Sequence, residues 1–142
     1  MVSVKKSALL PYPAASVFGL VENIEDYPNF LPWCSGVHVV TRSGQETIAS
    51  LQVQYLGIRT SFTTANKNEP SQWIEMRLVE GPFKVLQGRW TFVVLEEKAC
   101  KVELDLRYEF ASALLSKLIG PAFQQIANSL VSAFVARAEA VL

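Results

Sequence analysis

Few side chains in this sequence could carry out chemistry at neutral pH. The chain of 142 residues has one histidine, His38, and two cysteines, Cys34 and Cys100, which lie far apart in sequence. Metal sites and redox-active cysteine pairs have short ligand spacings that these residues lack. His38 stands among valines, with no serine–histidine–aspartate or cysteine–histidine pattern around it. We therefore expect no catalytic residue and no metal ligand, and predict a binding protein rather than an enzyme.

Arg137 has the most unusual position of the polar residues. In a helix that turns by about 100° per residue, it falls inside an apolar stripe, next to Leu130 in angle. A buried guanidinium needs a carboxylate partner. The pair would lock the helix to the N-terminal region or hold the polar head of a ligand; alternatively, Arg137 extends to water. The candidate partners are Glu22, Glu25 and Asp26.

Aromatic residues gather between two prolines near the N-terminus. Tyr27, Phe30 and Trp33 lie in a segment broken by Pro28 and Pro32, which we interpret as a short helix followed by a corner. These rings either surround the mouth of a ligand cavity, where they could also touch a membrane, or close one end of the core.

The elements that position these residues are predicted from hydrophobic periodicity. Residues 2–10 alternate as an edge strand, and residues 14–21 have helical spacing. From residue 36 to residue 110 the period is two, most clearly where residues 102, 104, 106, 108 and 110 are apolar and their neighbours are charged. Breaks at residues 43–44, 66–70, 81–82 and 96–98 predict consecutive hairpins. The result is an antiparallel meander with one apolar face.

A C-terminal helix should cover that face. Pro121 suits the first position of a helix that runs to about Val141. The apolar stripe of this helix consists of Phe123, Ile126, Ala127, Leu130, Phe134 and Val141. Residues 114–119 form an apolar lead-in, ended by Gly120, that could be a helical turn bridging the last strand to the helix and could act as a lid. The space between sheet and helix is either an open cavity or a filled core. The predicted cavity-lining residues are Tyr27, Phe30, Trp33, Tyr55, Met76, Phe83, Trp90, Phe92, Tyr108, Phe123, Ile126, Leu130, Phe134 and Arg137.

Composition limits the classes of partner. Thirteen basic and thirteen acidic residues give a net charge of zero, so only a local patch could attract nucleic acid or an anionic membrane, and we expect no sequence-specific nucleic-acid binding. We expect one domain over residues 1–142 and a cytoplasmic location, peripheral to the inner membrane at most, since no signal sequence or apolar run of about 20 residues is visible. The candidate basic patch is Lys5, Lys6, Arg42, Arg59, Lys67 and Lys84.

Three motifs carry a resemblance to a known family. They are Tyr-Pro-Asn-Phe-Leu-Pro-Trp-Cys at residues 27–34, Gly-Pro-Phe-Lys-Val-Leu-Gln-Gly-Arg-Trp-Thr-Phe at residues 81–92, and Ala-Phe-Val-Ala-Arg-Ala at residues 133–138. In this order they resemble the family of the bacterial RatA proteins and the mitochondrial coenzyme Q-binding proteins. The resemblance implies an α+β helix-grip, START-like fold, in which a curved antiparallel sheet of about six or seven strands wraps around the C-terminal helix.

The same resemblance implies three functions. The leading expectation is a non-catalytic chaperone that binds ubiquinone or a related polyprenyl lipid and supports respiration. The first alternative is a RatA-type toxin, the toxin of a toxin–antitoxin pair, that binds the large ribosomal subunit and inhibits subunit association. The second alternative, an aromatase or cyclase, lacks a placed acid and base in this sequence.

Overall fold

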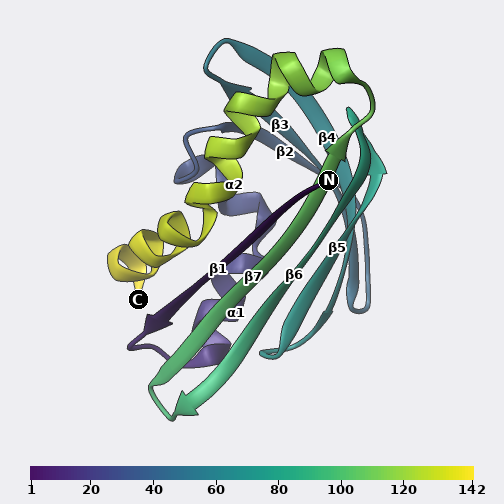
Figure 1. Ribbon diagram of the computed structural model, residues 1–142. Coiled ribbons are helices and arrows are strands. Elements are labelled where there is room, and N and C mark those ends of the chain that lie inside the picture. Colours follow the sequence, from purple (N-terminus) through teal and green to yellow (C-terminus); the bar gives the residue numbers. More distant parts are fainter.

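A seven-stranded antiparallel sheet curves around the C-terminal helix in the computed structural model, which describes residues 1–142 (Figure 1). The strand order is β1-β7-β6-β5-β4-β3-β2, so every neighbouring pair except β1 with β7 is joined by a hairpin. In chain order the elements are β1 (Val2–Leu10), α1 (Ala14–Glu22), the 3₁₀ helix η1 (Ile24–Asn29), β2 (Cys34–Ser43), β3 (Glu46–Tyr55), β4 (Ile58–Glu69), β5 (Trp73–Glu80), β6 (Phe83–Glu96), β7 (Ala99–Phe110) and α2 (Ala113–Val141). The START-like fold and the meander are confirmed.

Local turn chemistry explains the hairpins. Between β3 and β4 the loop is Leu56-Gly57, with φ angles of 50° and 80°. Positive φ at both central residues of a two-residue loop matches the right-handed twist of the flanking strands. One predicted break is wrong, because β4 continues through Asn66, which pairs with Thr47 on one side and Met76 on the other.

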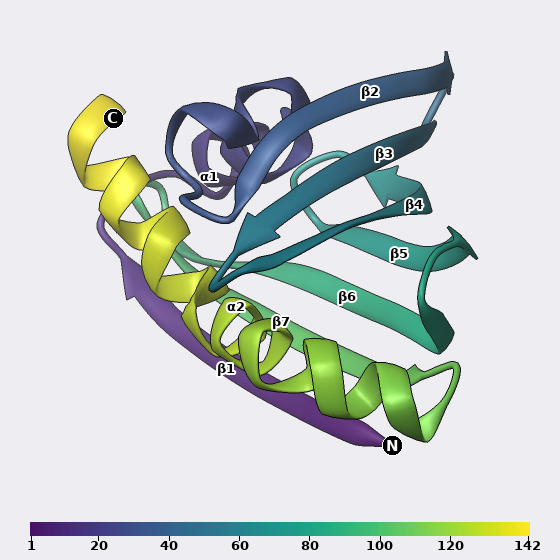
Figure 2. The same cartoon turned by 90° about the horizontal axis from the view of Figure 1, so that it is seen from above.

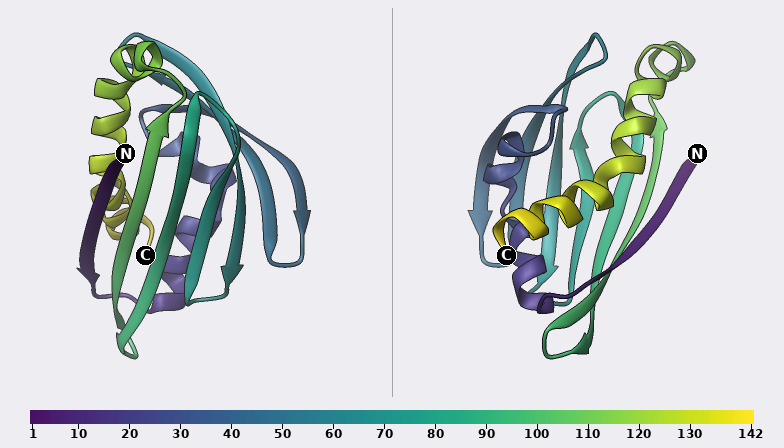
Figure 3. Two further views of the ribbon diagram at one scale, coloured as in Figure 1. Left: turned by 45° about the vertical axis from the view of Figure 1, so that its right-hand side comes forward. Right: turned by 90° about the vertical axis from the view of Figure 1, so that its left-hand side faces the viewer.

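The alternation in β7 separates two faces of the sheet. Residues 100, 102, 104, 106, 108 and 110 are buried, and the intervening charged residues face outward. The apolar face is concave and receives both α1 and α2 (Figures 2 and 3). On α1, Val17, Phe18 and Val21 are buried, and the ring of Phe18 lies 5.4 Å from that of Phe92.

The beginning of α2 differs from the prediction. The helix begins at Ala113, so Gly120 and Pro121 lie inside it rather than at its start. Ser112 explains the earlier start, because its hydroxyl oxygen accepts a hydrogen bond from the Leu115 N–H at 3.1 Å, as an N-cap does. Pro121 is exposed, so the hydrogen bond that it cannot make is lost on the solvent side. The helix follows a bent path across the concave face (Figure 2), as expected near an internal proline.

The buried stripe of α2 includes Phe123, Ile126, Ala127 and Phe134, as predicted. Val141 is 48% exposed, so its assignment to the stripe is wrong; the stripe ends at Ala138. By length and mean hydropathy, α2 could cross a membrane, a property that the core helices of soluble proteins share.

The turn between β5 and β6 provides a test of the fold. Gly81 has a φ of 156°, and a Cβ built there would lie 2.8 Å from Cβ of Phe62. Gly81→Ala should lower the free energy of unfolding by about 2–4 kcal/mol, from backbone strain and overpacking. Gly19→Ala is the control, since a Cβ at this helical position meets nothing within 4 Å. It should be neutral or stabilise by up to about 1 kcal/mol. Urea unfolding measures both, and equal effects would contradict the assigned turn geometry.

Candidate functional site

The predicted cavity residues gather on the concave side of the sheet. Eight of the fourteen are buried and the other six half-buried, and all except Arg137 belong to the hydrophobic core or pack against it. Whether they bind a ligand stays a prediction. The half-buried ones are Tyr27, Phe30, Tyr55, Met76, Leu130 and Arg137.

One aromatic cluster fills the space under the first half of α2. The ring of Phe123 lies 4.7 Å from that of Tyr108 and 5.0 Å from that of Phe83, and Phe83 stacks on Phe110 at 5.0 Å. Phe62 closes the cluster at 6.0 Å from Phe83. Phe62 and Phe110 were missing from the predicted set. Phe110 could have been found from the alternation of its strand. Phe62 could have been found from its position in β4, two residues before the buried Thr64 and therefore on the same face of the strand.

A second cluster forms where η1 meets the other half of α2. Phe134 lies 5.2 Å from Phe30, 5.3 Å from Trp90 and 5.4 Å from Tyr27. The Tyr27 hydroxyl donates a hydrogen bond to the backbone carbonyl of Val21, and burial raises the pKa of Tyr27 well above its usual value. The aromatic corner therefore closes one end of the core, as in the second of the two interpretations.

A small cavity lies beside the second cluster, between the sheet and the α1–η1 segment. A cavity of about 20 Å³ lies among Tyr27, Thr47, Asn66, Met76 and Trp90, among others. That volume suits one water molecule but not an isoprenoid chain. The side-chain oxygen of Asn66 is buried without a hydrogen-bond partner. Asn66 was missed because its segment was interpreted as a turn.

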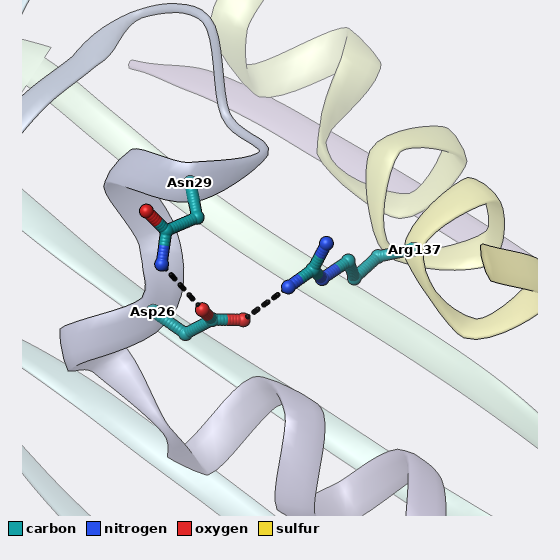
Figure 4. Close-up of polar contacts among 3 residues, drawn as sticks. All are labelled: Asp26, Asn29 and Arg137. Carbon is teal, nitrogen blue, oxygen red and sulfur yellow. Dashed lines mark hydrogen bonds and ion pairs between the residues drawn. The ribbon is translucent and has the colours of Figure 1, made fainter. Parts of the chain in front are cut away.

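Of its three candidate partners, Arg137 contacts Asp26 (Figure 4). Nη2 of Arg137 lies 3.1 Å from Oδ2 of Asp26, while Asn29 donates a hydrogen bond of 2.7 Å to Oδ1. The guanidinium also lies 5.1 Å from the centre of the Phe30 ring. The hydrogen bond from Asn29 lowers the pKa of Asp26 most, and Arg137 lowers it further. Burial acts in the opposite direction. The contact joins η1 to the last turns of α2, so the predicted locking role is met geometrically.

The other side chains singled out for their reactivity are the two cysteines and the histidine. Cys34 and Cys100 are both buried, which raises the pKa of each thiol. Such thiols behave as small apolar side chains, as expected for Cys34. His38 is exposed on β2.

A larger hollow lies on the opposite, outer face of the sheet. It has a volume of about 720 Å³ and is lined by residues of β1, β4, β5, β6 and β7. Of the predicted basic patch, Lys5, Lys6 and Lys67 line this outer trough, whereas Arg42, Arg59 and Lys84 do not, so the patch as predicted does not form. The trough instead adds four basic residues that were missed, Arg77, Arg89, Lys101 and Arg107.

Comparison with known proteins shows the family to which this chain belongs. The sequence profile of the polyketide cyclase / dehydrase and lipid transport family matches residues 10–135. The chain belongs to this family. Within it, a protein named ribosome association toxin RatA from Pseudomonas aeruginosa is 46% identical over 136 residues, covering 96% of this chain and 94% of the relative. The chain is therefore a RatA-type member. The mitochondrial coenzyme Q-binding protein coq10 of Schizosaccharomyces pombe is 26% identical over 143 residues, 95% of this chain and 85% of that protein.

Solved structures agree on the fold of the family. The aromatase/cyclase Zhui from Streptomyces sp. R1128 has a TM-score of 0.86 at 16% identity, over 97% of this chain and 93% of that one. A START superfamily protein from Mycobacterium smegmatis has a TM-score of 0.83 at 22% identity, over 99% of both chains. At these identities the likeness concerns the fold alone.

The Asp26–Arg137 pair gives a pH-dependent prediction. Its side chains are 23% and 26% exposed, so Arg137→Met should lower the free energy of unfolding by about 1 kcal/mol at neutral pH. The pKa of Asp26 is lower in the folded chain than in the unfolded chain. The stability that the pair contributes is therefore complete above the unfolded pKa of Asp26, and it is lost as the pH falls through the folded pKa. The difference from wild type should thus be constant from about pH 5 to pH 8 and shrink below about pH 4.

The control for this prediction is Arg42→Met. Arg42 contacts Glu25 of the same 3₁₀ helix at 2.8 Å, but both side chains are largely exposed, so the loss should stay below about 0.5 kcal/mol. Urea unfolding across pH measures both variants. Unchanged stability of Arg137→Met would remove the locking role.

Proposed function

We propose that this chain is a non-catalytic, cytoplasmic protein that associates with the ribosome, as its RatA relatives are named for doing. The observation that carries the proposal is the identity of 46% across nearly the whole length of the Pseudomonas relative. The coenzyme Q-binding relative is more distant, at 26%. This difference favours ribosome association. Quinone binding, the leading expectation from the sequence, becomes the second candidate.

The filled interior also supports recognition by the outer surface. Rings from two aromatic clusters pack between sheet and α2, and the cavity between the sheet and the α1–η1 segment has a volume of only about 20 Å³. A rigid, packed core presents a fixed surface to a large partner without a conformational change.

The polar residues of the interior support a non-catalytic role. The buried polar side chains are Thr47, Thr64 and Asn66, and none of them titrates near neutral pH. General acid–base catalysis needs a group with a pKa close to the operating pH. Asp26 and Arg137 are paired with each other and join two elements. Glu22, which is half-buried, is the carboxylate that lines the small cavity.

Sedimentation tests the proposal. The purified chain, mixed with isolated ribosomal subunits on a sucrose gradient, should sediment with the large subunit and, in excess, should keep added small subunits from joining it. An equal amount of heat-denatured chain is the control. A chain that stays at the top of the gradient, with unchanged subunit joining, would sink the proposal.

A hydrophobic ligand such as ubiquinone is the second candidate, favoured by the coenzyme Q-binding relative. The unpartnered Asn66 oxygen beside the small cavity accepts hydrogen bonds, so it would suit a hydroxyl donor such as that of the reduced quinol. A polyprenyl chain buries apolar area at about 25 cal/mol per Å², which could offset the opening of the core. Met76 would be the first side chain to move, because it lines the cavity and is unbranched and flexible.

Tryptophan fluorescence tests this candidate. Trp33 and Trp90 are only 5% and 3% exposed, whereas Trp73 lies on the outer face. If ubiquinone enters the core, titration should lower emission by the same absolute amount in wild type and in Trp73→Phe, and by a larger fraction in the variant, because the quenched rings are internal. Native mass spectrometry should then show the quinone bound at near-equal stoichiometry. Emission that does not change in Trp73→Phe would count against an internal ligand.

A further inference from the structure

The outer face of the sheet carries charges in register across five strands. In one row, Lys67 of β4 pairs with Glu75, Glu75 with Arg89, Arg89 with Asp105, and Asp105 with Lys5 of β1. Positive and negative residues alternate along this row, and Glu75 forms an ion pair with Arg89. Opposite charges on neighbouring strands stabilise a sheet. The basic residues of this row therefore partly neutralise its acidic residues.

The next row is positive without acidic members. Ala65, Arg77, Gln87, Arg107 and Ser3 follow one another across the same five strands. Arg77 is in no ion pair, and Arg107 has Asp105 at 3.9 Å. Lys5 and Lys6, which line the same trough, are in no ion pair either. The trough therefore holds basic groups that are free to meet an external anion.

The charge of the trough differs from that of the rest of the chain. Seven basic residues and three acidic residues line it, a surplus of four positive charges. The formal net charge of the chain is zero, so the remainder has a surplus of four negative charges. A neutral protein with its charges separated in this way is oriented by a polyanion, with the trough toward it.

We infer that this outer trough, rather than the space between sheet and helix, binds the phosphate backbone of ribosomal RNA. The inference rests on the proposed ribosome association and names the surface that performs it. Basic residues on five strands, spaced by about 4.8 Å, span roughly 19 Å, enough to contact several phosphates. In the neighbouring row of alternating charge, Glu75 pairs with Arg89, so the unpaired basic groups of the trough, such as Arg77 and Lys5, would make the phosphate contacts.

An anionic membrane fits this surface less well. Peripheral membrane binding combines basic residues with apolar side chains that enter the bilayer. The exposed large apolar residues of this chain, among them Leu9, Leu56, Val94 and Leu114, do not line the trough. An open surface with a surplus of basic residues instead suits an extended polyanion such as an RNA backbone.

Matched triple variants test the inference. Lys5→Gln, Lys67→Gln and Arg77→Gln together remove three positive charges from the trough. Arg59→Gln, Lys98→Gln and Lys117→Gln remove the same charge from exposed residues outside it, with the same numbers of lysine and arginine. A third protein, with Lys5→Arg, Lys67→Arg and Arg77→Lys, keeps the charge of the trough. All six positions are exposed, and thermal unfolding checks that each variant is folded.

The measurement is the affinity of each protein for purified large subunits at several salt concentrations. The trough variant should bind at least about 10-fold more weakly at 0.1 M salt, and the slope of log Kobs against log salt should be shallower by about 3. The outside variant and the charge-keeping variant should stay within about 2-fold of wild type. This pattern supports the inference.

Other outcomes separate the two proposals. If wild type binds subunits and the trough and outside variants lose affinity equally, the trough is not the binding surface, although the ribosome association stands. If wild type does not bind subunits, the proposed function fails and this inference fails with it. If the trough variant loses affinity only for vesicles of phosphatidylserine and phosphatidylcholine, a membrane replaces RNA as the partner and the inference is overturned.

Discussion

Burial of one apolar helix face in a strongly curved sheet is the constraint on which the structure depends. The large buried side chains of α2, such as Phe123, Ile126 and Phe134, each contribute about 1.5–3 kcal/mol by leaving water. The sheet has to curve far enough to surround them, and the hairpin turns and the length of its strands permit that curvature. Removal of the helix would expose to solvent the part of the concave face that α1 does not cover.

The same constraint divides the molecule into two chemically different sides. Inside, rings contact rings edge to face, and the few polar groups are uncharged or paired at the end of the core. Outside, charged residues alternate with the buried ones along each strand, as β7 shows most clearly. Related proteins can therefore share one fold while some use the interior and others the exterior, because substitutions on one side of a strand leave the other side unchanged.

The parts of the structure that could be predicted are those that depend on neighbours in sequence. Alternation in β7 and helical spacing in α2 identified both elements and their buried faces. The start of α2 was missed because Pro121 was weighed as a helix start and the capping hydroxyl of Ser112 was overlooked. Asn66 was interpreted as part of a turn from its residue type, although pairing with strands on both sides holds it in β4.

The outer trough could not be predicted because it depends on register between distant strands. Lys5 reaches Asp105 only through the pairing of β1 with β7. Likewise, three acidic residues were possible partners for Arg137, and only the packing of η1 against α2 selects Asp26. Patterns in one sequence identify faces, whereas the position of one face relative to another comes from tertiary contacts.

The order of elements along the chain has a consequence for biosynthesis. The helix that fills the core is the last element to be made, and β1, the first, pairs with β7, the last strand. The sheet cannot be completed, nor its apolar face covered, until nearly the whole chain has left the exit tunnel. The growing chain therefore exposes an uncovered apolar surface until α2 has emerged and docked.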